Sequence, residues 1–256
     1  MKIISYSDLH LEFGYNFRPP KDSDADLMIL AGDIVTFRNF KPLGWMLREW
    51  HKPVLYVAGN HEFYTTRPMD AGALAFKEWL AERHPNVRFL QDEAVTIDGV
   101  HFFGGTMWTD FNGVDRAAMT HAEQGMNDYS QIMLPNGQFL KPIDTVAYHM
   151  SFVENLRRWF EDDLPGKRVV ISHHAPVVNP NTQHGNSPYM PAYNSLDMLP
   201  IIETYQPALW VYGHTHECDD QMVGNTRIIS NQHGYPGYGG KYKCAGFDKA
   251  GLIVEV

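Results

Sequence analysis

The sequence is poor in cysteine and in long apolar runs, and each shortage excludes a class of protein. Its 256 residues include only two cysteines, Cys218 and Cys244, which are too few for a disulfide framework. We therefore expect the protein to be located in a reducing compartment, the cytoplasm. No apolar run approaches the roughly 20 residues that span a bilayer, so no membrane partner is expected. The N-terminal stretch MKIISYSDLHLEF lacks a signal-peptide cleavage pattern and is interpreted as a first strand.

Basic residues are also scarce: 21 Lys and Arg stand against 30 Asp and Glu, which gives a net charge of −9. Such a chain lacks the positive field that nonspecific binding to nucleic acid needs, so a nucleic-acid partner is not expected. Bound cations can reverse local charge, so this argument against a nuclease is a modest one. Hydrophobic residues make up 44% of the chain, and no repeat or long linker divides it. We expect one domain over residues 1–256, and no feature of the sequence indicates an oligomeric state.

Apolar runs of strand length alternate with helical patterns along most of the chain. The expected strands are residues 2–7, 26–32, 53–60, 87–90, 94–98, 100–105, 168–172, 208–212, 226–230 and 252–256. The expected helices are residues 39–51, 69–83, 143–164 and 196–205, and the ambiguous stretch 114–133 is assigned to helix as well. In residues 69–83, Phe76, Trp79 and Leu80 recur at the i, i+3, i+4 spacing of an amphipathic helix. This alternation favours an α/β domain of two packed sheets with flanking helices.

Five of the expected strands end in residues that are able to bind metal ions. The clusters are Asp8-Leu9-His10, Gly32-Asp33, Gly59-Asn60-His61-Glu62, His173-His174 and Gly213-His214-Thr215-His216. In α/β sheets, ligand sites form at the carboxyl ends of the strands, so neighbouring strands would bring these clusters to one place. Each cluster alone also has an ordinary interpretation as a turn, a core residue or a surface residue. Their occurrence together, in this order, favours a site.

The spacing and chemistry of these clusters indicate a centre with two metal ions. In an extended segment, residues i and i+2 point the same way, so Asp8 with His10 and His214 with His216 are expected to face one site. The donors are oxygen and nitrogen, without cysteine, which suits Mn, Fe or Zn. There are more donors than one ion needs, and two ions about 3.5–4 Å apart, bridged by a carboxylate, would use them all.

The ordered set of motifs between residues 8 and 216 resembles the calcineurin-like metallophosphoesterase family, and in particular its bacterial-type phosphohydrolases. The resemblance implies a four-layered α/β/β/α sandwich of two mixed sheets, with the metal site at the carboxyl ends of the strands. Carried over by position, one ion would be held by Asp8, His10, Asp33 and His216. The second ion would share Asp33 and would also be held by Asn60, His173 and His214, with His173 preferred over His174.

The resemblance also implies a reaction, in which a hydroxide bridging two divalent ions attacks the phosphorus of a small phosphate ester in line. His61 would act as the general acid at the leaving oxygen. Glu62 belongs to the same motif but is expected to support the loop rather than to bind a metal ion. A phosphodiester is the expected substrate. A phosphomonoesterase, a nuclease and a scaffold that has kept the fold without catalysis are the alternatives.

Two departures from relatives narrow the expected substrate. In GDIVTFR, Thr36 and Phe37 stand where the protein phosphatases of this family have the Asp and Arg that partner the general acid and clamp phosphate. This difference argues against a protein phosphatase. His61 also stands where the branch that cleaves a lipid A precursor usually has Arg, which argues against that branch.

Two later segments are candidates for contacts with substrate. Residues 175–195 follow His173 directly and are rich in Pro, Asn and Tyr, so they are expected either to select the substrate or to form an ordinary surface loop. Residues 233–238, HGYPGY, are interpreted as a Gly/Pro turn, with a rim of the cleft as the alternative.

Overall fold

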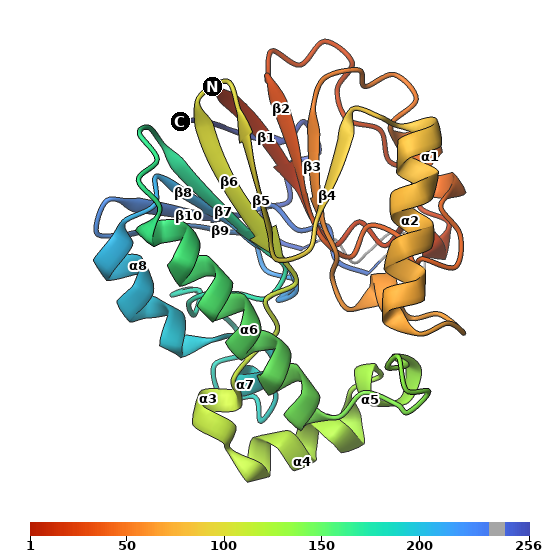
Figure 1. Ribbon diagram of the computed structural model, residues 1–256, viewed down its shortest axis with the longest axis vertical. Helices are drawn as coiled ribbons and strands as arrows, with labels where there is room; N and C mark the ends of the chain where they lie inside the picture. The colour runs from red at the N-terminus through yellow and green to blue at the C-terminus, as the bar shows by residue number, and fades with distance from the viewer. Residues whose placement is uncertain (236–243) are drawn as a thin grey trace.

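The computed structural model describes residues 1–235 and 244–256, and its two β-sheets pack face to face with helices on their outer sides (Figure 1). The layers run helix, sheet, sheet, helix, as the resemblance implied. Among the described residues, no helix combines the length and the apolar character needed to cross a bilayer.

The first sheet has the strand order β11-β1-β2-β3-β4. Its strands are β1 (Lys2–Tyr6), β2 (Leu27–Ala31), β3 (Val54–Val57), β4 (Val87–Leu90) and β11 (Leu252–Glu255). Strands β1 to β4 are parallel, and β11 joins β1 as an antiparallel edge. The central strands are covered on both faces, which is why they appear in the sequence as continuous apolar runs.

The second sheet has the order β5-β6-β7-β8-β10-β9, with a parallel centre and antiparallel edges. Its strands are β5 (Glu93–Ile97), β6 (Val100–Gly105), β7 (Arg168–Ser172), β8 (Leu209–Val211), β9 (Asp219–Val223) and β10 (Thr226–Ser230). Strand β9 was not expected, because its sequence DDQMV has no apolar run. Strand β9 lies at the edge of the sheet, where polar residues are tolerated.

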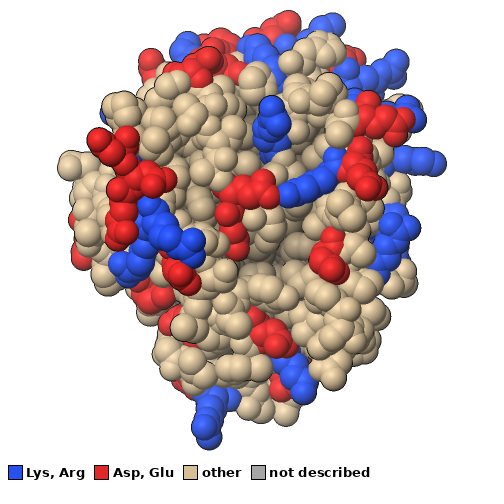
Figure 2. All heavy atoms as spheres, in the orientation of Figure 1, with Lys and Arg blue, Asp and Glu red and all other residues tan. Residues whose placement is uncertain are grey.

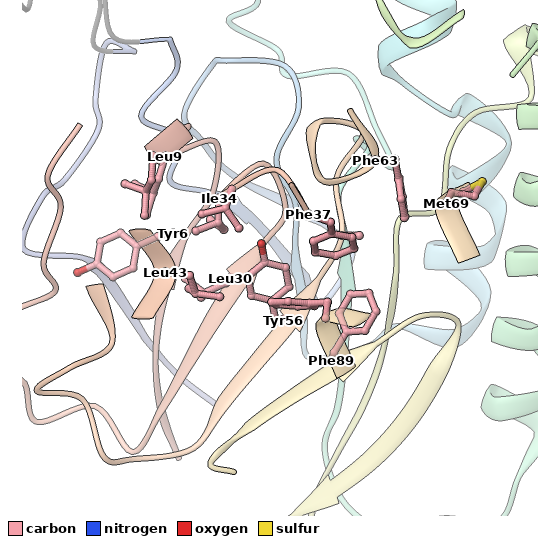
Figure 3. Close-up of a cluster of buried hydrophobic side chains, with 14 of the residues drawn as sticks. Tyr6, Leu9, Leu30, Ile34, Phe37, Leu43, Tyr56, Phe63, Met69 and Phe89 are labelled. Atoms are coloured by element: carbon pink, nitrogen blue, oxygen red, sulfur yellow. The ribbon is translucent and has the colours of Figure 1, made fainter. Parts of the chain in front are cut away.

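Three hydrophobic cores hold the layers together. One lies between the sheets and includes Ile29, Leu55, Phe102, Ile171 and Val211. A second lies between the first sheet and helices α1 (Lys41–Met46) and α2 (Met69–Arg83), and Figure 3 shows part of it. The third lies between the second sheet and helices α6 (Pro142–Glu161) and α8 (Leu199–Tyr205), which the 3₁₀ turn η3 (Leu196–Met198) precedes.

One helical expectation needs correction. The helix expected over 39–51 is only α1, because the chain turns after Met46 so that Trp50 is buried beyond the helix while Trp45 is 62% exposed. Helix α6 buries a stripe that includes His149, Phe152 and Leu156. Met150, one residue away from that stripe, is 65% exposed.

Several short helices lie beyond the carboxyl ends of the strands (Figure 1). They are α3 (Phe111–Val114), α4 (Arg116–Gly125), α5 (Asp128–Gln131) and α7 (Met190–Tyr193). The ambiguous stretch 114–133 therefore contains two separate helices, α4 and α5. Asp115 caps the start of α4, because its side chain accepts hydrogen bonds from the amides of Ala117 and Ala118. These helices bring polar residues to the strand ends.

Candidate metal centre

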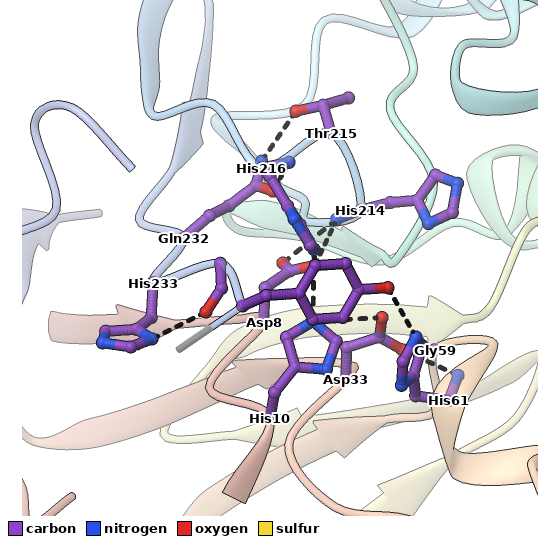
Figure 4. A network of polar contacts seen from close by, with 12 residues as sticks. Asp8, His10, Asp33, Gly59, His61, His214, Thr215, His216, Gln232 and His233 are labelled. Atoms are coloured by element: carbon purple, nitrogen blue, oxygen red, sulfur yellow. Dashed lines mark hydrogen bonds and ion pairs between the residues drawn. The ribbon is translucent and has the colours of Figure 1, made fainter. Parts of the chain in front are cut away.

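The residues expected to bind metal ions lie in loops that follow β1, β2, β3, β7 and β8, and the structure brings them together (Figure 4). They form two groups whose ligand atoms lie within 4.8 Å of one another. The first group is Asp8, His10, Asp33 and His216, and the second is Asp33, His173 and His214. Asp33 belongs to both groups, which is the arrangement that a bridging carboxylate requires.

In the first group, carboxylates and imidazoles face each other at short range. His216 Nε2 lies 3.3 Å from Asp8 Oδ1, and His10 Nε2 lies 3.8 Å from Asp33 Oδ2. The two Nε2 atoms of His10 and His216 are 3.1 Å apart. Asp8, His10 and Asp33 are buried.

In the second group, His173 occupies the central position. Its Nε2 lies 3.4 Å from Asp33 Oδ1 and 3.0 Å from Asn60 Oδ1, and His214 Nδ1 lies 3.2 Å from the same nitrogen. His173 Nδ1 is 2.9 Å from the carbonyl oxygen of Ala31 and so carries the proton, which leaves the Nε2 lone pair directed at the group. Asn60 thus stands beside the second group.

The neighbouring His174 is placed differently. Its Nδ1 contacts the carbonyl oxygen of Thr106 at 3.2 Å, and its ring packs against Trp108 and His214. His173 rather than His174 therefore lies next to Asp33, as the resemblance implied.

The donor set fits two divalent cations. Burial lowers the pKa of His10 and of His173 to about 4, which keeps both rings neutral, the state in which imidazole binds a metal ion. Burial, together with the charges of Glu62 and Asp8, raises the pKa of Asp33 well above its usual value. Buried carboxylates at this density are unfavourable without a compensating cation, and a dication supplies that charge.

The loops that carry these residues are not extended, so the geometric reason expected for the i, i+2 spacing was wrong. Five ligand candidates have positive φ angles: 53° at Asp8, 45° at His10, 55° at Asp33, 72° at His214 and 53° at His216. Such angles are strained for residues other than glycine and are typical of functional loops. Asp8 and His10 still face one site, while Leu9 between them is buried in the second core (Figure 3).

Glu62 links the loop that follows β2 to the loop that follows β3 through hydrogen bonds. Its fully buried carboxylate accepts hydrogen bonds from the amides of Asp33, Ile34 and Gly59 at 2.9, 2.9 and 2.7 Å. The hydroxyl of Tyr56 donates a fourth hydrogen bond at 2.5 Å. Burial raises the pKa of Glu62, and these hydrogen bonds act in the opposite direction. The contacts agree with a supporting role for Glu62.

Two glycines let the backbone approach the carboxylates closely. A Cβ atom at position 59 would lie 2.1 Å from Asp33 Oδ1, and one at position 213 would lie 2.6 Å from Asp8 Oδ2. Because no side chain fits at these positions, only glycine can precede Asn60 and His214 without a steric clash. The amide of His214 donates to both oxygens of Asp8 at 3.1 Å.

His61 is held on three sides beside the centre. Its amide donates to Asp33 Oδ1 at 2.9 Å, its ring Nδ1 lies 3.0 Å from Glu12 Oε1, and its Nε2 lies 2.8 Å from the hydroxyl of Tyr235. Burial alone would raise the pKa of Glu12, but hydrogen bonds from His10 and His61 lower that pKa to about 2. Glu12 is therefore a carboxylate between two imidazoles.

Sequence reasoning missed Glu12, Tyr64 and Asp128. Asp128 is buried and accepts hydrogen bonds from the hydroxyl of Tyr64 and, at 2.8 Å, from Asn60 Nδ2. This bond leaves Asn60 Oδ1 facing the second group. Glu12 follows His10 by two positions in DLHLEF, so the same alternation that linked Asp8 to His10 was a signal for it.

A pocket of about 310 Å³ opens beside the centre. It is lined by Asp33, Asn60, Tyr64, Gly125, Met126, Asn127, Asp128, His184, Ser187, Tyr193, His214, Thr215, His216 and Tyr235. From the candidate segment 175–195, His184, Ser187 and Tyr193 thus reach the pocket. Of the segment 233–238, Tyr235 lines the pocket as a rim residue, and residues 236–238 lie outside the described part of the chain.

A sequence model of the family described as calcineurin-like phosphoesterase matches residues 1–218, most of the chain. The chain belongs to the calcineurin-like phosphoesterase family. This calcineurin-like phosphoesterase is therefore a metal-dependent phosphoester hydrolase, from a family that uses two metal ions.

Relatives extend over nearly the whole calcineurin-like phosphoesterase chain. Uncharacterized protein L509 of Acanthamoeba polyphaga mimivirus is 27% identical, with 92% of each chain covered. UPF0046 protein K07C11.7 of Caenorhabditis elegans is also 27% identical, over 90% of this chain and 69% of that protein. Among solved structures, phosphopantetheinyl hydrolase (PptH) of Mycobacterium tuberculosis aligns with a TM-score of 0.66 at 20% identity, over 92% of this chain and 90% of that one. At this identity the likeness shows the fold alone.

Proposed function

We propose that this chain hydrolyses small phosphodiesters with two divalent metal ions. The single observation that supports this most is the pair of donor groups that share Asp33, beside a histidine, His61, whose Nε2 contacts Tyr235 in the lining of the pocket. The proposed ligands are Asp8, His10, Asp33 and His216 for one ion, and Asp33, Asn60, His173 and His214 for the other.

The residues of the chain have distinct parts in the proposed reaction. When bound, two dications activate water as a nucleophile and neutralise the charge on the phosphate. Asp33 accepts the amide hydrogen of His61 and so holds that residue at the edge of the centre. His61 then donates a proton from Nε2 to the leaving oxygen. The hydroxyl of Tyr235, 2.8 Å from this nitrogen, marks a position that an oxygen atom can take.

The charge of the pocket favours a diester over a monoester. Of its described lining residues, none is Lys or Arg, and Asp128 adds a carboxylate. Lys241 and Lys243 lie outside the described residues. A diester carries one negative charge and a monoester at neutral pH carries up to two, so the diester meets less repulsion here.

A nuclease is the weaker alternative on this site. On the face drawn in Figure 2, Lys and Arg side chains are scattered among Asp and Glu and do not form a continuous basic stripe. The net charge of −9 also works against binding a long polyanion. A scaffold without catalysis has no need for a full donor set with His61 in place, so the enzyme is the preferred interpretation.

The test is hydrolysis of bis-p-nitrophenyl phosphate and p-nitrophenyl phosphate by metal-stripped protein, before and after addition of Mn, Fe or Zn. We expect metal-dependent cleavage with a preference for the diester, and its loss in Asp33→Ala and His61→Ala. A preference for the monoester would indicate that the enzyme is a phosphomonoesterase instead. Absence of cleavage of both esters and of a phosphopantetheinyl ester, despite bound metal, would contradict the proposal. The phosphopantetheinyl ester is included because the phosphopantetheinyl hydrolase of Mycobacterium tuberculosis has a similar fold.

A further inference from the structure

One carboxylate oxygen lies between two histidines that have different proposed roles. Glu12 Oε1 is 3.2 Å from His10 Nδ1 and 3.0 Å from His61 Nδ1. The two rings meet edge to face with centroids 4.4 Å apart. Glu12 is in the 3₁₀ turn η1 (Leu11–Phe13), and its side chain is only 15% exposed. It therefore contacts a proposed metal ligand and the proposed general acid at once.

These three side chains are also close enough to hold a metal ion of their own. Tautomer chemistry argues against that alternative. His10 Nε2 faces Asp33 in the metal centre, so the proton of the neutral ring is on Nδ1. A nitrogen that carries a proton donates a hydrogen bond and does not bind a metal ion. The contacts with Glu12 are therefore hydrogen bonds from two N–H donors to one acceptor.

We propose that Glu12 is a positioning residue that fixes the orientation of His61 for proton transfer. The inference rests on the proposed function. With Nδ1–H held by Glu12, the Nε2 atom of His61 faces the hydroxyl of Tyr235, a residue that lines the pocket. When the P–O bond to the leaving group breaks, the departing oxygen keeps the bonding electron pair and takes the Nε2 proton. His61 is left neutral with Nδ1–H still bonded to Glu12, and water returns the proton to Nε2.

This arrangement also links the general acid to the metal centre. Glu12 supports the ring of His10 in the same way as it supports that of His61, and it does so through the same oxygen atom. Loss of the carboxylate should therefore affect proton transfer and metal binding by separable amounts. The two effects are distinguished by the leaving group of the substrate, because only proton transfer to the leaving oxygen depends on it.

The first test compares Glu12→Gln with the parent protein on methyl p-nitrophenyl phosphate and methyl phenyl phosphate, at saturating metal. Phenol is the poorer leaving group and depends more on a general acid. We expect a loss of about 100-fold on the phenyl ester and less than about 5-fold on the p-nitrophenyl ester. His61→Ala should show the same pattern, and the double variant should lose little more than either single variant. The exposed Glu49→Gln is the matched control and should change neither rate.

The second test measures the ring itself and needs no turnover. In the Zn-loaded protein, at a pH at which the ring is neutral, imidazole nitrogen NMR should show His61 as the Nδ1–H tautomer, and in Glu12→Gln as a mixture of tautomers. An unchanged tautomer would overturn the proposal, as would equal loss on both esters that excess metal restores. If the parent protein cleaves neither ester, the proposed function fails instead, while the NMR result still decides whether Glu12 positions His61.

Discussion

The floor and the wall of the pocket are built in different ways. The floor lies at the strand ends, where Asp33 lines the pocket and the buried Asp8 and Glu62 lie behind it. Each of these three carboxylates accepts a hydrogen bond from the backbone of another loop. In the wall, which segment 175–195 contributes, the middle of the segment is exposed and its hydrogen bonds are mostly local, such as that from the amide of His184 to Thr182 Oγ1 at 3.1 Å. The residues that carry the chemistry are therefore held by long-range contacts, whereas the wall depends mainly on local ones.

The largest effect is expected at the floor residue that both donor groups share. Asp33→Asn keeps the shape of the side chain and an acceptor for the amide of His61, but it removes the charge between the groups. Because each dication contributes several kcal/mol to catalysis, we expect kcat/KM to fall by at least about 1,000-fold. Bound metal, measured by elemental analysis, should also fall. Activity within 10-fold of the parent would show that Asp33 does not join two ions.

Behind the floor, Glu62→Ala should have its main effect on the stability of the fold. The substitution leaves the buried amides of Asp33, Ile34 and Gly59 and the hydroxyl of Tyr56 without their acceptor. We expect the free energy of unfolding to fall by about 3–5 kcal/mol in urea titrations. Glu82→Ala, at an exposed position of α2, is the control and should stay within about 0.5 kcal/mol of the parent. Equal stability of the two variants would mean that water replaces Glu62.

At the boundary between floor and wall, Asp128→Ala should have an intermediate effect. Asp128 accepts from Asn60 Nδ2 and thereby turns Asn60 Oδ1 toward His173. Loss of such a supporting contact typically lowers metal affinity or activity by about 10–100-fold, which a Mn titration of activity would measure. Asp128→Asn keeps an acceptor oxygen and should lose much less. If both variants behave alike, the charge of Asp128, rather than its hydrogen bond to Asn60, is what matters.

The parts of the molecule that the sequence predicted are those determined by burial and by strand direction. Buried parallel strands leave continuous apolar runs, so β2 and β3 were expected close to their observed bounds. The residues at the strand ends were found because strand direction alone brings carboxyl ends to one edge of a sheet. Edge strand β9 carries no such run and was missed.

The remaining parts of the site depend on contacts that no local pattern encodes. Asp128 meets Asn60 across 68 positions of the chain, through a short helix that only tertiary packing brings to the strand ends. The positive φ angles at Asp8 and His10 could not be inferred from alternation, which assumes an extended chain. Alternation placed both residues on one side correctly, but the loop reaches this result by another conformation.

The smallest effect is expected in the wall. His184 lines the pocket with a side chain that is 53% exposed, and its Nε2 lies 3.8 Å from Glu217 Oε1. His184→Ala should therefore change the ratio of kcat/KM between two diesters with different alcohol groups by less than about 10-fold. Metal content and the free energy of unfolding should stay at the parent values, because the side chain supports neither the donors nor the core. An equal loss of kcat/KM on every ester, together with loss of bound metal, would instead show that His184 supports the metal centre. In that case this part of the wall would not serve substrate selection alone.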